Sequence, residues 1–245
     1  MSTGMNMANR EVCDVNFYDL ATNKLVSRFD TANVTGLSLS GDSVYAMAKG
    51  ARRIAFQNPQ EGTLTITCQV MPFEAYAMLS DGTISTSAVV PVRKVIKATT
   101  AKELAFDEAG TIVDGSIGVV VLGNPWITDN MIEVTKGTGK LTADSIEADK
   151  EYEVVYLVSK TSGVKTVTFD KDHVAKGYKI VMSTNFKDEN DVLIPFIITV
   201  YKATPQRNIE MSFSSEGDPM EMEWTFDILE SKEKKFVEIT EDMSE

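Results

Sequence analysis

Three groups of residues have the types that could support chemistry. The stretch Gly137-Thr-Gly-Lys140 contains the Gly-Lys pair that also occurs in phosphate-binding loops. The acidic run at 188–191 has side chains that could ligate calcium. His173 is the only histidine, so it is the only imidazole available as a base or a metal ligand. Each group defines a function that the surrounding sequence must then support.

The stretch around Lys140 lacks the spacing of a nucleotide-binding loop. Such a loop needs a glycine where this chain has Val134, and a serine or threonine where it has Leu141. A strand-like pattern follows Lys140, whereas a phosphate loop leads into a helix. The sequence therefore predicts a hairpin turn here and no nucleotide.

The acidic turn and the lone histidine give equally little support to a metal site or an active site. The run at 188–191 and the nearby Asp170 and Asp172 lack the glycine and glutamate spacing of a calcium-binding hand. With one histidine a serine triad has a single candidate base, and no Gly-x-Ser-x-Gly motif occurs. We expect no enzyme and no cofactor. A calcium-binding module, or a glycosidase with paired carboxylates, remains an alternative.

Acidic and apolar residues alternate through GDPMEMEWTFDIL, residues 217–229. An alternation of period two is typical of a strand with one face in the core. The acidic row then faces away from that core and needs another explanation. The buried row is predicted to contain Met220, Met222, Trp224, Phe226 and Ile228, and the acidic row Glu221, Glu223, Thr225 and Asp227.

The elements that would position this strand are mostly further strands. Period-two patterns occur at 12–18, around 37–44 and at 62–70, and they predominate from 138 onward, including RNIEMSFS at 207–214. Pro72 and Glu74 favour a helix over 72–79. Residues 92–123 fit either a short helix near Thr100 or a loop between strands at 92–98 and 111–122. Many short strands with turns between them predict a β-sandwich or barrel.

Charge and composition restrict the partners. The net charge is −12, and residues 216–245 contribute −8 of it, which disfavours binding to nucleic acid or to an anionic membrane. No apolar run approaches the ~18 residues of a membrane span, and residues 1–12 lack the apolar segment of a secretion signal. Cys13 and Cys68 lie in strand patterns and are predicted to be free thiols of a reducing cytoplasm.

The C-terminal region resembles the major tail tube proteins of long-tailed bacteriophages. The likeness rests on Lys202-Ala203, Pro205, the serine-rich stretch at 213–214, the Glu216–Pro219 turn and Thr225-Phe226-Asp227. GTLTITCQVMPFEAYAML and TGKLTADSIEADKEYEVVYLVS fit the same family in outline. Residues 1–12 and 83–130 carry little of the resemblance.

The resemblance implies a fold for the whole chain. It is a β-sandwich of two packed antiparallel sheets with one flanking short α-helix, a long loop and flexible termini, in a single domain over 1–245. That domain would have an N-terminal arm at 1–11, an inter-ring loop at about 47–60 containing Arg52 and Arg53, and an acidic tail at 230–245.

The resemblance also implies a function. Copies would form stacked hexameric rings of a phage tail tube, assembled in the host cytoplasm, and genomic DNA would pass through without specific binding. Partners would be the tape measure protein, the tail-tip or baseplate hub and the tail terminator, with a sheath protein left open and no membrane. Another virion or surface β-sandwich protein, for decoration or adhesion, is the alternative. The predicted channel-lining residues are Glu210, Glu221, Glu223 and Asp227.

Overall fold

A computed structural model describes residues 6–80, 83–108, 110–172 and 174–242. The fold is mainly β, with several antiparallel sheets and one short α-helix, which confirms the predicted fold class. The chain forms two compact units: unit 1 comprises Met1–Thr83 and Phe169–Glu245, and unit 2 comprises Ile84–Thr168. Each unit is described by itself. The single domain over 1–245 stays a prediction.

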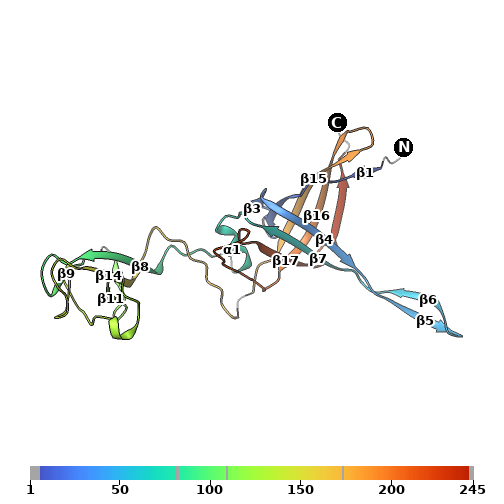
Figure 1. The fold of residues 1–245 in the computed structure, drawn as a ribbon. Coiled ribbons are helices and arrows are strands. Elements are labelled where there is room, and N and C mark those ends of the chain that lie inside the picture. The colour runs from blue at the N-terminus through green and yellow to red at the C-terminus, as the bar shows by residue number, and fades with distance from the viewer. Residues whose placement is uncertain (1–5, 81–82, 109, 173, 243–245) are drawn as a thin grey trace. The chain divides into compact units, whose positions relative to one another are not determined.

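Unit 1 is built on a nine-stranded antiparallel sheet with the order β3-β2-β15-β16-β17-β7-β4 (Figure 1). Two further strands extend it, because β1 pairs with β15 and β18 pairs with β16. The strands are β1 (Met7–Ala8), β2 (Asp14–Asp19), β3 (Leu25–Phe29), β4 (Ala32–Ser40), β7 (Glu61–Cys68), β15 (Tyr178–Asp188), β16 (Leu193–Pro205), β17 (Met222–Ile228) and β18 (Val237–Glu241).

Strands from the two halves of this sheet face each other across the core of unit 1. Phe29 of β3 lies 4.9 Å from Trp224 of β17, and Phe17 of β2 lies 5.5 Å from Phe226, measured between ring centroids. In the strand order, β15 and β16 separate β2 from β17. The sheet therefore curves back on itself, and the two layers of the sandwich in unit 1 are parts of one continuous sheet.

Helix α1 (Glu74–Leu79), which the sequence predicted over 72–79, contributes to the same core. Ala75, Met78 and Leu79 pack in the cluster that contains Trp224. Cys68 is buried beside them, and burial raises the pKa of its thiol. Both cysteines are free, as predicted, although Cys13 is only partly buried.

Strands β5 (Ser43–Ala48) and β6 (Ala51–Gln57) form a separate hairpin between β4 and β7. In Figure 1 it continues beyond the ends of β4 and β7, away from the large sheet. Every residue of β6 is exposed. Most of the predicted loop at 47–60 is therefore this hairpin.

Unit 2 has its own core and sheets. A four-stranded sheet contains β8 (Ala88–Lys97), β10 (Thr111–Ile112), β11 (Gly118–Val121) and β14 (Glu151–Lys160), and a three-stranded sheet contains β9 (Glu103–Ala105), β12 (Thr135–Gly137) and β13 (Lys140–Thr142). A 3-10 helix, η1, spans Thr128–Asn130. Leu104, Leu141 and Tyr152 are fully buried between these elements.

Two segments differ from the sequence-based expectation. The predicted strand RNIEMSFS at 207–214 forms no strand, because no described strand pairs with it. The tail predicted to be flexible at 230–245 contains β18, which pairs with β16 from Phe196 to Val200. Val237 and Ile239 alternate with Glu238 and Thr240 there, so pairing with β16 places the two apolar residues on one face of the sheet.

Candidate assembly and channel surfaces

Strand β17 separates the two rows of residues onto opposite faces. The side chains of Met222, Trp224 and Phe226 lie in the core of unit 1, with exposures of 1%, 2% and 0%. Glu223 and Asp227 alternate with them and are exposed. Because successive side chains of a strand point to opposite faces, the acidic row lies on the outer face of the sheet.

The outer face around β17 is mostly polar. Thr67, Thr65 and Thr63 of β7 lie opposite Glu223, Thr225 and Asp227 in the antiparallel register. Directly opposed residues of an antiparallel pair share a face, so the carboxylates stand beside hydroxyl groups. This face offers hydrogen-bonding groups and negative charge, and Val34 of β4, opposite Thr67, adds one exposed apolar side chain.

Three of the four predicted channel residues lie together. Glu210, Glu221 and Glu223 line one hollow, together with Thr67, Asn208 and Ser212. Glu210 reaches it from 206–221, a segment that runs beside β17 without pairing as a strand; the backbone N–H of Gln206 donates to the carbonyl of Thr225. The segment 207–214 was predicted to be a strand and is not one. Its alternate residues Asn208, Glu210 and Ser212 nevertheless line the hollow beside Glu221 and Glu223.

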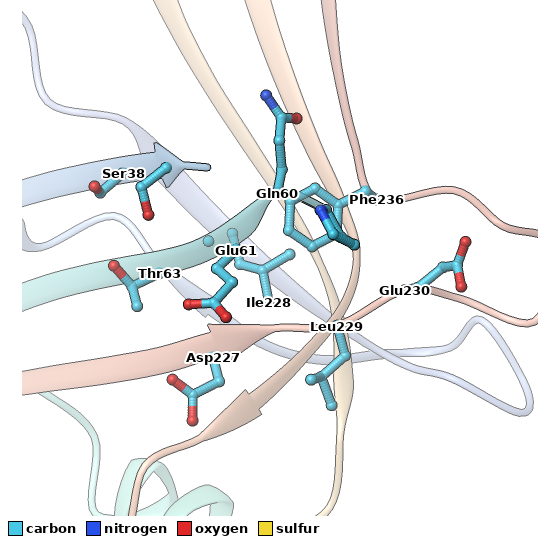
Figure 2. Close-up of a pocket in the computed structure, with 12 residues that line it drawn as sticks. Ser38, Gln60, Glu61, Thr63, Asp227, Ile228, Leu229, Glu230 and Phe236 are labelled. Atoms are coloured by element: carbon cyan, nitrogen blue, oxygen red, sulfur yellow. The ribbon is translucent and has the colours of Figure 1, made fainter. Parts of the chain in front are cut away.

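Asp227 lies apart from these three, at the end of the row. Its carboxylate accepts a hydrogen bond from the side-chain amide of Gln206 at 2.7 Å. It borders an open groove of about 840 Å³, shown in Figure 2. Glu61 of β7 and Glu230, which follows β17, lie on the same groove, so three carboxylates from two separate parts of the chain surround it.

The floor of this groove is apolar and tightly packed. Ile228, Leu229 and Phe236 line it. A Cβ atom on Gly62 would lie 2.8 Å from the side chain of Leu39 and 3.1 Å from those of Ile228 and Phe236. Glycine at position 62 therefore lets these side chains close over β7, beside the carboxylate of Glu61.

The sequence did not point to Glu61, Glu230 and Phe236 as parts of one site. Glu61 begins the alternating stretch EGTLTITC and shares its face with Thr63, which is a local signal for exposure. Nothing local indicates that this position meets residue 230, more than 160 positions later in the chain. Only the pairing of β17 with β7 brings them together.

The predicted inter-ring residues lie on the hairpin of β5 and β6. Arg52 and Arg53 are both exposed, and the guanidinium carbon of Arg52 lies 4.4 Å from the ring centroid of Tyr45. Val44 pairs with Phe56 and Ala46 pairs with Ile54, so one face of the hairpin is entirely apolar. Both faces lack a partner within the described chain.

The sequence offered three groups of residues that could support chemistry. Two of them have structural roles, and the third lies outside the described residues. Gly139, with φ of +70°, forms the turn between β12 and β13, as expected of a hairpin. The carboxylate of Asp188 accepts the backbone N–H groups of Asn190 and Val192, both at 2.8 Å. His173 lies outside the described residues.

Metal-ligating side chains do not gather in the described ranges: no group of three among His, Cys, Asp and Glu could hold an ion. Within the same residues, no helix has the length and apolar character needed to cross a bilayer.

Comparison with known proteins gives one result for nearly the whole chain. Residues 10–239 match the model of the YomU/Tube protein family, and this range includes β17, the groove and the hairpin. No curated protein matches the chain.

Proposed function

The chain belongs to the YomU/Tube protein family of phage tail tube proteins, and from this premise we propose that its copies form hexameric rings that stack into a hollow tube. The tube is the channel through which genomic DNA leaves the virion. The protein itself is a structural component of the phage tail, and its function is self-assembly into the tube.

The observation that carries the channel proposal is the acidic outer face at β17. Glu210, Glu221 and Glu223 surround one hollow, while Trp224 and its neighbours lie in the core behind them. A negative wall repels phosphate groups, and a duplex passing along it would find no cationic contacts to hold it. Asp227 continues the row to its end, so the four residues would line one stretch of the channel.

Open sheet edges support ring formation. Strands β3 and β4 end the strand order of the large sheet, and β4 is nine residues long. Unpaired backbone groups on such an edge favour pairing with another chain. If each edge pairs with the opposite edge of the next copy, a heterologous contact repeats and closes into a ring.

The exposed hairpin supports contact between rings. It carries Arg52 and Arg53, and its apolar face of Val44, Ala46, Ile54 and Phe56 has no cover in the described chain. An apolar surface of this kind is buried in functional assemblies. We assign the hairpin to the contact with a neighbouring ring. The tape measure protein, the tail-tip or baseplate hub and the terminator are the partners proposed for the tube and its ends.

Electron microscopy of the purified protein tests this function. Negatively stained samples over a range of concentrations, with and without the tail-tip initiator, should contain rings or tubes. Compact monomers or trimers under all these conditions would contradict the assembly and favour a decoration or adhesion protein instead. Sedimentation of the same samples measures the fraction assembled.

A further inference from the structure

The groove at the end of β17 and the hairpin tip carry opposite charge. Residues 43–57 contain Lys49, Arg52 and Arg53 and no acidic residue, although the net charge of the chain is −12. The groove is lined by Glu61, Asp227 and Glu230 and by no basic residue. Three positive charges therefore concentrate on one feature of unit 1 and three negative charges on another.

None of these groups forms an ion pair within the part of the chain that the structure describes. Arg52 stacks on Tyr45, and Asp227 accepts one hydrogen bond from a neutral amide. Elsewhere in unit 1 charged residues do pair, as Arg28 does with Asp14 at 2.9 Å. The two features are thus complementary in charge and unpaired in the isolated chain.

A hairpin cannot place its tip in the groove at its own base. Residues 59–61 line the groove, directly after β6. Strand β6 has 7 residues, which at ~3.3 Å per residue hold the tip roughly 20 Å beyond the base of the hairpin. A basic hairpin tip that occupies this groove would therefore belong to another copy of the chain.

The apolar residues of the two features also correspond. The groove has a floor of Ile228, Leu229 and Phe236, and Leu229 is 41% exposed. Met47, beside the hairpin turn, is 60% exposed. A tip that places its cations against the carboxylates would also bring Met47 to this floor. Apolar burial at the centre with charges at the rim is typical of protein interfaces.

We propose that the groove formed by Glu61, Asp227, Glu230 and Phe236 is the receptor for the basic hairpin tip of a second copy. The contact is head-to-tail, so each copy uses its tip on one neighbour and its groove on another. Such a contact propagates into a filament instead of closing on a pair. This inference rests on the proposed function, because it names the surface that the inter-ring hairpin binds.

Charge reversal on both sides tests the contact. The hairpin variant is Arg52→Glu with Arg53→Glu, and the groove variant is Glu61→Lys with Glu230→Lys. Each variant alone would place like charges at every contact, and we expect the protein concentration needed for assembly to rise at least ~10-fold. In a 1:1 mixture, each contact between the two different variants again brings opposite charges together. The protein concentration that the mixture needs for assembly should therefore lie within about 3-fold of that of the wild type.

A matched control keeps the result specific. Asp30→Lys with Glu216→Lys makes the same charge change as the groove variant at exposed positions of unit 1 outside the groove. This control should assemble like the wild type, and thermal melting should show that all variants fold. The readouts are sedimentation and negative-stain images of each sample.

The outcomes separate this inference from the proposed function. If the wild type assembles and the groove variant assembles equally well, the receptor is elsewhere and the inference is overturned while the tube function stands. The inference is also overturned if the two variants fold but their 1:1 mixture does not assemble. A wild type that never assembles overturns the tube function, and the receptor with it.

Discussion

Phe29 meets Trp224 edge-on in the core of unit 1, with the ring planes at 70° and the centroids 4.9 Å apart. The contact joins β3 to β17 across the curved sheet, so it fixes an edge strand against a strand from the other half of the sheet. The indole N–H of Trp224 is buried and has no hydrogen-bond partner among the described residues. Packing alone therefore explains the position of this side chain.

Trp224→Ala should lower the free energy of unfolding by about 3–5 kcal/mol, because it leaves a large cavity between β3 and β17. Trp224→Phe should cost less, since it keeps a ring against Phe29 and removes the unpaired N–H. Glu223→Gln, on the opposite face of the same strand, is the control and should change stability by no more than about 0.5 kcal/mol. Urea unfolding measures all three.

Replacing Glu210, Glu221 and Glu223 with lysine should leave folding intact and change the behaviour of the tube toward DNA. All three are exposed, and the change takes the charge of the hollow from −3 to +3 per copy. Tubes of normal appearance should then retain DNA in a mobility-shift assay and release it as salt rises. Normal tubes that bind no DNA even at low salt would place the channel wall on another surface.

Gly62→Ala should destabilise unit 1 by about 1–3 kcal/mol, the usual cost of overpacking a closed site. The added methyl group would press on Leu39, Ile228 and Phe236. Gly36→Ala on neighbouring β4 is the matched control, because a Cβ there meets nothing within 4 Å. A calorimetric melt of both variants decides the matter, and equal melting temperatures would mean that the groove floor yields.

Unit 2 should lose stability in acid through Glu108. The hydroxyl of Tyr156 and the ammonium of Lys94 donate to its carboxylate and lower its pKa from 4.5 to about 2. A carboxyl whose pKa is lower in the folded state stabilises the fold above its unfolded pKa, and that contribution disappears as the pH falls from about 4.5 to about 2.

Glu108→Gln should therefore reduce stability at pH 7 and flatten the pH dependence of unit 2 over that window. Trp126 is in unit 2 and Trp224 in unit 1. In a Trp224→Phe background, indole fluorescence thus follows the unfolding of unit 2 alone. An unchanged acid slope in the Gln variant would show that other carboxylates control it.

Trypsin should cut the free subunit at the hairpin tip and spare it after assembly. Lys49, Arg52 and Arg53 are exposed on an isolated two-stranded hairpin, and such hairpins are marginally stable. Mass spectrometry of brief digests, taken before and after sedimentation of tubes, measures the cleavage. Lys232, which is exposed in the segment between β17 and β18, provides an internal reference.

Local patterns predicted the faces of β17 and the position of α1, because side-chain periodicity depends on near neighbours alone. The pairing of strands depends on residues far apart in the sequence, and this explains both errors in strand assignment. The segment 207–214 has the alternation of a strand but no ladder, whereas Val237–Glu241 finds an edge on β16 despite its charge. The groove could not be predicted from the sequence, since only the pairing of β7 with β17 brings Glu61 and Glu230 to the same groove.

Unit 2 leaves and rejoins the chain at one place. The backbones of Ser85 and Thr166 exchange two hydrogen bonds, of 2.9 and 2.8 Å, so the entry and exit of the insertion lie side by side. A segment with adjacent ends behaves as a cassette: it can be lengthened, exchanged or cut out while the strands that precede and follow it keep their spacing. Changes in the length or surface of unit 2 can in this way leave the strands of unit 1 and their pairing unchanged.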